Sequence, residues 1–196
     1  IPPGDVQCRY VDKYGYERRC PVVNRPWGCL GTIVCFDMTV PETASALVRR
    51  GAEVILHPTC EPHGGGRSAW EMGRRARAFE NTVYVVSAAM GGEYLNHADT
   101  VPNLYSRGHA KIVNFDGNVQ VVADGPGRVA LEGRIDLRAL RTARAKPFSN
   151  LAAWDEPGDY GPLSAAPPGR PTDAMARQPA DTTNPRTNPP GHGGRP

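Results

Sequence analysis

Three short apolar runs, separated by two helical stretches, constrain the fold more than any other feature of this sequence. The runs at 29–35, 52–57 and 82–87 are rich in β-branched residues and have the length of buried strands. Helical spacing of apolar residues predicts helices over 41–51 and 68–81, the first opened by a proline and closed by a glycine. Strands and helices that alternate in this order predict an α/β layered fold with crossover connections.

A different pattern follows in the later part of the chain. Two apolar strands are predicted at 110–115 and 118–123, and the Asp-Gly pair at 116–117 between them is typical of a tight hairpin turn. A further strand is predicted near 129–135. A short helix should follow it, with Asp136 as the N-cap.

Composition divides the chain near residue 160. The segment 161–196 holds 9 Pro and 5 Gly in 36 residues and cannot bury a core. We therefore predict one globular domain over 1–160 and a Pro/Gly-rich disordered tail over 161–196. Within the domain, 1–28 reads as turn-rich and irregular.

Charge, hydropathy and cysteine content exclude several classes of protein. The 23 Lys and Arg residues against 20 Asp and Glu give a net charge of +3, too small for a polybasic nucleic-acid binder. No apolar run approaches the ~20 residues of a transmembrane helix. The 5 cysteines are an odd number without close pairs, which fits neither a secreted disulfide framework nor a zinc ribbon. Reduced thiols in a cytoplasmic protein are expected.

Cys35 is the strongest candidate for a catalytic residue. It ends a predicted buried strand, just before a turn and a helix, so it lies at the sheet edge where α/β active sites concentrate. A nearby helix N-terminus favours a thiolate and a developing oxyanion. The alternative interpretation is a buried structural cysteine at a strand end.

The residues around Cys35 resemble the nucleophile segment of the nitrilase superfamily, the carbon–nitrogen hydrolases. The segment reads Gly-Thr-Ile-Val-Cys-Phe-Asp-Met-Thr-Val-Pro-Glu at 31–42. The similarity is closest to the aliphatic amidase and formamidase branch and extends roughly from residue 20 to residue 150. Further blocks agree with the family in the same order, at 50–54, 77–86, 108–117 and 135–144.

This resemblance implies a four-layer αββα sandwich, of which the chain would hold only the later portion, and a Glu–Lys–Cys triad. Cys35 matches the nucleophile, and the backbone N–H of Phe36 would help to hold the oxyanion. The glutamate and the lysine are expected upstream of Ile1, with Lys13 as a surface charge. The chain alone is accordingly expected to be a weak catalyst.

Other candidates carry weaker signals. In the family, the strand end after His57 borders the substrate pocket, so Cys60 and Glu61 are predicted to line it. His57, Cys60, Glu61 and His63 are metal-type ligands, but the prolines among them argue against a zinc site, so neither metal nor cofactor is predicted. Glu17 is either a second, structural glutamate or a surface charge.

The function predicted from the sequence is hydrolysis of a non-peptide carbon–nitrogen bond in a small linear amide. A thioester on Cys35 would form with release of ammonia. Two alternatives stay open, namely acyl transfer through the same thioester and a catalytically dead binding module of this fold. The expected partners are a small-molecule amide and further copies of the chain, with no nucleic acid and no membrane. A cysteine protease would need a histidine partner, and His57, His63, His97 and His109 lie in no protease-type motif.

Overall fold

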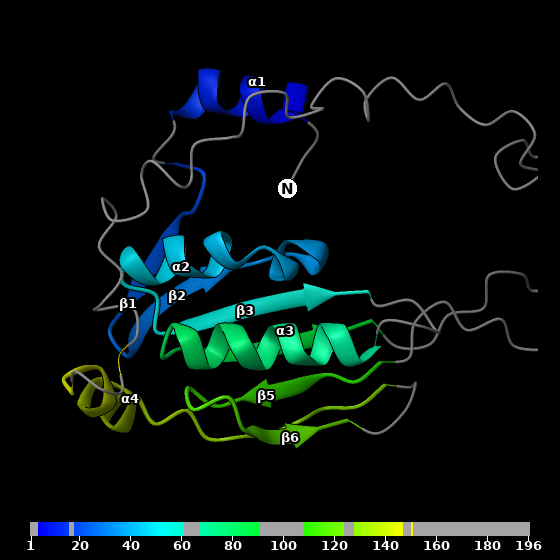
Figure 1. Cartoon of the computed structure of the whole chain (residues 1–196), viewed down its shortest axis with the longest axis vertical. Helices are drawn as coiled ribbons and strands as arrows, with labels where there is room; N and C mark the ends of the chain where they lie inside the picture. The colour runs from blue at the N-terminus through cyan, green and yellow to red at the C-terminus, as the bar shows by residue number, and fades with distance from the viewer. Residues whose placement is uncertain are drawn as a thin grey trace, which may run out of the picture. The chain divides into compact units, whose positions relative to one another are not determined.

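The apolar runs of the sequence pair edge to edge in one mixed sheet (Figure 1). The computed structural model describes residues 4–15, 18–60, 67–90, 108–123, 128–146 and 150, all within the unit Ile1–Asp155. The predicted tail therefore lies outside the described residues. The described elements are α1 (Gly4–Tyr14), β1 (Val22–Arg25), β2 (Gly28–Thr32), the 3₁₀ helix η2 (Cys35–Thr39), α2 (Pro41–Arg49), β3 (Val54–Thr59), α3 (Arg67–Glu80), β4 (Tyr84–Ala89), β5 (Lys111–Val113), β6 (Val119–Val122) and α4 (Leu137–Arg144).

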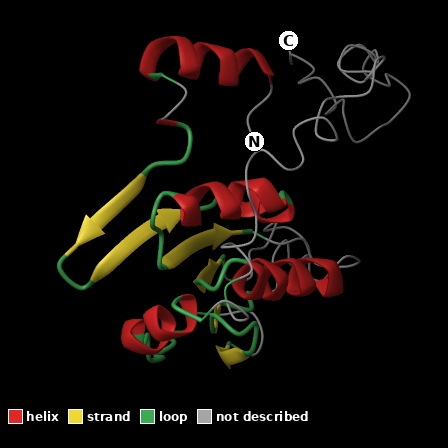
Figure 2. Ribbon diagram, turned by 60° about the vertical axis from the view of Figure 1, so that its left-hand side comes forward, coloured by secondary structure: helices red, strands yellow, loops and turns green. Residues whose placement is uncertain are grey.

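The described strands follow the order β1-β2-β3-β4-β5-β6 in the sheet. Strands β2, β3 and β4 are parallel and are joined by the crossover helices α2 and α3, whereas β1, β5 and β6 each pair antiparallel with a neighbour (Figure 2). The α/β architecture expected from the sequence is confirmed. The carboxyl ends of three parallel strands consequently meet at one edge of the sheet.

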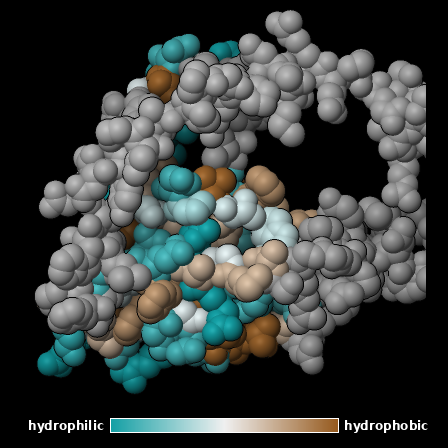
Figure 3. All heavy atoms as spheres, in the orientation of Figure 1, coloured by the Kyte–Doolittle hydropathy of each residue, from teal (hydrophilic) through white to brown (hydrophobic). Residues whose placement is uncertain are grey.

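Alternating side chains give the sheet two faces with separate cores. Ile55 and Val85 point toward α2 and α3 and belong to a core of fully buried side chains. Their neighbours Val54 and Tyr84 point the other way and pack against Leu140 of α4. Figure 3 shows hydrophilic and hydrophobic side chains interspersed over the outer surface on the side of α2 and α3. Among the described helices, none is long and apolar enough to cross a membrane.

Several local predictions are confirmed. Pro41 is the first residue of α2, and the Asp136 side chain caps α4 by accepting a hydrogen bond from the Ala139 N–H at 2.9 Å. The predicted hairpin forms between β5 and β6, with Gly117 at φ +79° in its turn. Each of these predictions depends on residues close together in the sequence.

Three predictions about secondary structure were wrong. Residues 1–28 contain the helix α1 and the strand β1, which pairs with β2. Strand β3 continues through Pro58, because Pro58 lies beyond Leu56, the last residue of β3 that pairs with β2. The missing proline N–H therefore breaks no bond between those strands.

The third wrong prediction is the strand near 129–135, where the described residues form no ladder. The side-chain amide of Gln120 replaces a strand partner there. It accepts a hydrogen bond from the Arg134 N–H at 2.8 Å and donates one to the Arg134 carbonyl at 3.0 Å. Both backbone groups of Arg134 are thus satisfied without a neighbouring strand.

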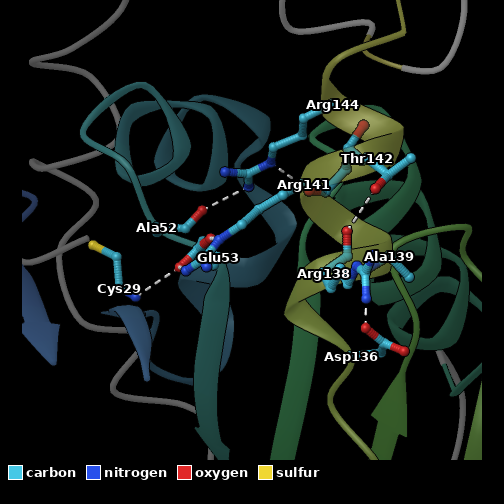
Figure 4. A network of polar contacts seen from close by, with 10 residues as sticks. Cys29, Ala52, Glu53, Asp136, Arg138, Ala139, Arg141, Thr142 and Arg144 are labelled. Atoms are coloured by element: carbon cyan, nitrogen blue, oxygen red, sulfur yellow. Dashed lines mark hydrogen bonds and ion pairs between the residues drawn. The ribbon is translucent and has the colours of Figure 1, made fainter. Parts of the chain in front are cut away.

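Charged side chains close the amino ends of the parallel strands (Figure 4). Glu53, which precedes β3, accepts hydrogen bonds from Arg141 Nε at 2.6 Å, from Arg141 Nη2 at 3.1 Å and from the Cys29 N–H at 3.0 Å. The hydrogen bond from Arg141 holds the pKa of Glu53 below its usual value, although burial acts in the opposite direction. Glu53 thereby ties α4 to β2.

A second arginine of α4 extends this network. Arg144 donates to the Thr82 carbonyl at 2.9 Å and to the Ala52 carbonyl at 2.7 Å, and these two residues precede β4 and β3. Burial lowers the pKa of Arg144. We call Glu53, Arg141 and Arg144 the clamp. It fixes the amino ends of three parallel strands to one helix.

Candidate active site

Cys35 is the first residue of η2 and lies just beyond the carboxyl end of β2. Its φ of +47° places it in the left-handed region, which residues other than glycine rarely adopt. The turn continues with a hydrogen bond from the Asp37 N–H to the Val34 carbonyl at 3.0 Å. A strained conformation of this kind persists only where the surroundings enforce it, and it is a frequent property of functional residues.

The thiol of Cys35 lies next to the carboxyl end of β3. Its Sγ donates to the Cys60 carbonyl oxygen at 3.9 Å. Cys60 itself is half-buried and directly follows β3, so the structure brings two of the predicted site residues together. Glu61 lies outside the described residues.

Phe36 follows Cys35 in the same turn. Its ring is 64% exposed and meets the ring of Trp70 edge-on, with centroids 6.2 Å apart. Trp70 belongs to α3, so the two rings link the turn at Cys35 to the helix that follows β3. The oxyanion role of the Phe36 N–H remains a prediction.

A buried histidine supports the backbone of Cys35. His57 Nε2 lies 3.1 Å from the Cys35 carbonyl oxygen, and His57 Nδ1 lies 3.0 Å from Ser87 Oγ. The imidazole therefore bonds to the main chain of Cys35, while the thiol bonds to the Cys60 carbonyl. This arrangement differs from the cysteine–histidine pair of a cysteine protease, in which the histidine takes the thiol proton.

His57 belongs to a row of buried polar side chains that crosses the sheet. His57 pairs with Ser87, and Ser87 pairs with Lys111, on three neighbouring strands at the same level. All three are at least 95% buried and lie on the face covered by α3. Lys111 forms an ion pair with Glu71 of α3, which also contacts Arg74. We call His57, Ser87 and Lys111 the polar row.

The charges at the far end of the polar row compensate one another. Burial raises the pKa of Glu71, but the hydrogen bond and the charge of Lys111, together with Arg74, outweigh it and bring the pKa below its usual value. Glu71 is therefore a carboxylate that neutralises a buried ammonium group. In the described part of the chain, no group of three His, Cys, Asp or Glu residues is arranged to hold a metal ion.

Cys35 was predicted from the sequence, whereas the polar row was not. His57 was interpreted as a possible metal ligand or protease-type partner, Lys111 as one of three lysines that could supply a catalytic amine, and Ser87 had no predicted role. The signal was present in the strand period, because His57 is two residues from Ile55 and Ser87 is two residues from Val85. Polar residues in a run of core positions indicate a buried polar network.

Two of the remaining sequence candidates, Lys13 and His109, lie among the described residues. Lys13 is exposed in α1 with its ammonium group 5.1 Å from the centre of the Tyr14 ring. His109 has φ +68° just before β5. Glu17, His63 and His97 lie outside the described residues.

The sequence is similar to one protein family and to amidases of known name. The sequence profile of the family named carbon–nitrogen hydrolase matches residues 2–145. Deaminated glutathione amidase of Homo sapiens is 38% identical over 123 residues, which is 62% of this chain and 35% of that protein. The Bos taurus protein of the same name is 37% identical over 145 residues, which is 72% of this chain and 42% of that protein.

The same family appears in the structural comparison. A carbon–nitrogen hydrolase from Helicobacter pylori G27 superposes with a TM-score of 0.60 at 22% identity, over 70% of this chain and 50% of that chain. This likeness shows the fold. The chain spans less than half the length of the two amidases it resembles.

Proposed function

The chain belongs to the carbon–nitrogen hydrolase family, and on that premise we propose that it hydrolyses the carbon–nitrogen bond of a small linear amide through a thioester on Cys35. The observation that carries the proposal is the conformation of Cys35. A cysteine with φ +47° stands in a strand-to-helix turn at the carboxyl end of parallel strands. This is where α/β folds place their ligands, and a sharp turn of this type exposes a nucleophile.

The proposed reaction has two steps. The Cys35 sulfur attacks the amide carbonyl carbon, a carbon–sulfur bond forms, and the carbon–nitrogen bond breaks as ammonia leaves with the thiol proton. Water then adds to the thioester, the carbon–sulfur bond breaks as a carboxylic acid leaves, and one proton of that water protonates the sulfur. In this proposal the Phe36 N–H donates to the oxyanion that forms in each step.

Two further groups complete the proposed reaction. The family resemblance assigns the base to a glutamate and the positive charge near the oxyanion to a lysine. Among the described residues, the thiol of Cys35 contacts the Cys60 carbonyl and the main chain of Cys35 contacts His57. Neither of these contacts is a glutamate or a lysine. We therefore propose that the catalytic glutamate and lysine belong to other parts of the protein.

The substrate is proposed by chemical class. The amidases similar to this chain are named for deaminated glutathione, which supports an amide substrate and gives no particular support to the aliphatic amidase or formamidase branch. We keep a small linear amide as the proposal, with Cys60 and Glu61 lining its pocket. Formamide, propionamide and deaminated glutathione are therefore the substrates to compare.

Two properties of the whole protein are also proposed. Cys20, Cys29, Cys35 and Cys60 are free thiols, which supports a reducing compartment such as the cytoplasm. Homo-oligomers are expected from the family resemblance, and light scattering of the purified chain measures their size.

The test follows ammonia release and the mass of Cys35 in the full chain. Incubation with propionamide, followed by acid quenching, should leave a propionyl group on Cys35, and the Cys35→Ala variant should show neither the adduct nor ammonia. Cys20→Ala, which removes a half-buried thiol of another segment, is the matched control and should behave as the unaltered chain. Ammonia release that survives Cys35→Ala would contradict the proposal.

A second arm of the same experiment separates hydrolysis from acyl transfer. Hydroxylamine added with propionamide intercepts a thioester and forms a hydroxamic acid. Hydrolysis predicts that propionic acid forms at the same rate as ammonia without hydroxylamine. Ammonia released only when an amine acceptor is present would identify acyl transfer instead.

A further inference from the structure

We propose that His57 is a positioning residue that holds the nucleophile turn in its left-handed conformation, an inference that rests on the proposed role of Cys35. His57 is fully buried between the sheet and the helices that cover it. It reaches the main chain of Cys35 from the neighbouring strand β3. Its effect on the reaction would pass through the backbone of the nucleophile rather than through the thiol.

The hydrogen bond to the Cys35 carbonyl determines the state of the imidazole. A carbonyl oxygen can only accept, so His57 Nε2 must carry the proton that it donates at 3.1 Å. In the neutral ring, Nδ1 then accepts from the Ser87 hydroxyl at 3.0 Å. Ser87 thus fixes the plane of the ring, and the ring fixes the Cys35 carbonyl.

The backbone around Cys35 needs such a support. The last pair between β2 and β3 joins Thr32 to Leu56, and the Ile33 N–H reaches the Leu56 carbonyl at 3.0 Å. Cys35 lies beyond these bonds, and its φ of +47° is unfavourable for a residue with a Cβ atom. The imidazole of His57 gives it a fixed partner on β3 where the regular strand pairing has ended.

The polar row gives the imidazole a rigid base. Ser87 pairs in register with His57 on one side and with Lys111 on the other, and Lys111 is held by its ion pair with Glu71. A buried hydroxyl that bonds to an imidazole at 3.0 Å, on a strand whose neighbour carries a buried ion pair, is held in place by its surroundings. The position of the Cys35 carbonyl is therefore linked through Ser87 to the packing of α3 on the sheet.

The decisive experiment compares four variants of the full chain, with propionamide turnover and alkylation of Cys35 as separate readouts. His57→Leu removes the hydrogen bond, whereas His57→Gln keeps an N–H donor at nearly the same place. Val85→Ala is the control, since it removes a fully buried side chain from the same face of β4, two residues before Ser87. Thermal unfolding of each variant reports its stability.

His57→Leu should lower kcat about 100-fold with KM nearly unchanged, because a nucleophile displaced by about 1 Å loses its attack geometry. His57→Gln should recover most of this loss. The kcat of Ser87→Ala should lie between those of His57→Leu and His57→Gln. This variant tests the proposal even if His57→Leu does not fold. Val85→Ala should lose stability and keep kcat.

Equal losses of kcat in His57→Leu and Val85→Ala would overturn the inference, because His57 would then be an ordinary buried side chain. A folded His57→Gln variant that remains as slow as His57→Leu would overturn it as well. Alkylation of Cys35 by iodoacetamide, located by mass spectrometry, should slow in His57→Leu and recover in His57→Gln. If the unaltered chain shows no turnover, the proposed activity of this chain is contradicted, and the alkylation series still decides the role of His57.

Discussion

At the amino end of the parallel strands a left-handed turn is made by Gly51, whereas at the carboxyl end it is made by Cys35. Gly51 has φ +102° just after α2, and Cys35 has φ +47° just before it. Glycine adopts this conformation without penalty, but a residue with a Cβ atom loses of the order of 1 kcal/mol. Cys35 therefore carries a backbone cost that Gly51 does not carry, and at the amino end of β4 Thr82 carries a similar one with φ +46°.

The cysteines at the two ends differ in the same way. Cys29 is buried beside the clamp, and burial, followed by the charge of Glu53, raises the pKa of its thiol. Cys35 is half-exposed and begins a helical turn. A thiol that stays protonated contributes packing, whereas an accessible thiol in a strained turn is suited to attack. The buried thiol at the amino end therefore belongs to the packing, and the accessible thiol at the carboxyl end is the one for which we propose a catalytic role.

The largest expected effect tests this division directly. Cys35→Ser should reduce amide turnover at least about 1000-fold, because a hydroxyl is a much weaker nucleophile than a thiol. Cys29→Ala should leave kcat within about threefold, since Cys29 contacts the clamp through its backbone N–H. Ammonia release by both variants measures the difference, and equal losses would remove the distinction between the two ends.

A change in the clamp should act on stability instead. Glu53→Gln keeps an acceptor for the Cys29 N–H but removes the charge that Arg141 binds. We expect a lower free energy of unfolding and a lower urea midpoint, with a modest change because the Arg141 side chain is 60% exposed and solvent screens its charge. Urea titration followed by circular dichroism measures it. An unchanged unfolding midpoint would show that the clamp contributes little.

The clamp should stabilise the fold at neutral pH and weaken in acid. The pKa of Glu53 lies below its unfolded value, mainly because Arg141 donates to it, so the stabilisation is present above pH ~4.5 and is lost as pH falls through the folded value. Urea titrations at neutral pH and near pH ~4 should therefore differ less in Glu53→Gln than in the unaltered chain. The same pH slope in both proteins would exclude Glu53 as a source of acid sensitivity.

The smallest expected effect concerns the strain itself. Cys35→Gly should be more stable than Cys35→Ala by about 0.5–1 kcal/mol, because glycine has no Cβ penalty at φ +47°. Both variants lack the thiol, so the comparison isolates the backbone. Thermal unfolding of the two proteins under identical conditions gives the difference. Greater stability of the alanine variant would show that the turn is relaxed.

Much of the fold was predictable because its signals are local. Each signal depends only on residues close to it in the sequence. Examples are Pro41 at the start of α2, the Asp136 cap and the turn at Gly117. The position of Cys35 at a strand end was predictable for the same reason. The left-handed backbone of Cys35 was not, because it depends on how η2 begins and on contacts with β3.

The errors arose where a partner distant in sequence decides the structure. Strand β1 is recognisable only through its pairing with β2, and the extended segment at Arg134 depends on the side chain of Gln120. The polar row likewise requires the register between three strands, which places His57 beside Ser87. Strand period alone indicates the face of each residue, but it does not give the neighbour across the sheet.

The two hydrogen bonds between the Gln120 side chain and the Arg134 main chain imply that positions 120 and 134 tolerate substitution differently. Arg134 takes part through its main chain, and its own side chain is 86% exposed with its guanidinium group 3.8 Å from the Asp136 carboxylate. Nearly any residue except proline could therefore occupy position 134 and keep both bonds. Position 120 allows far less, because only a side chain of the same length with both a donor and an acceptor can replace the missing strand.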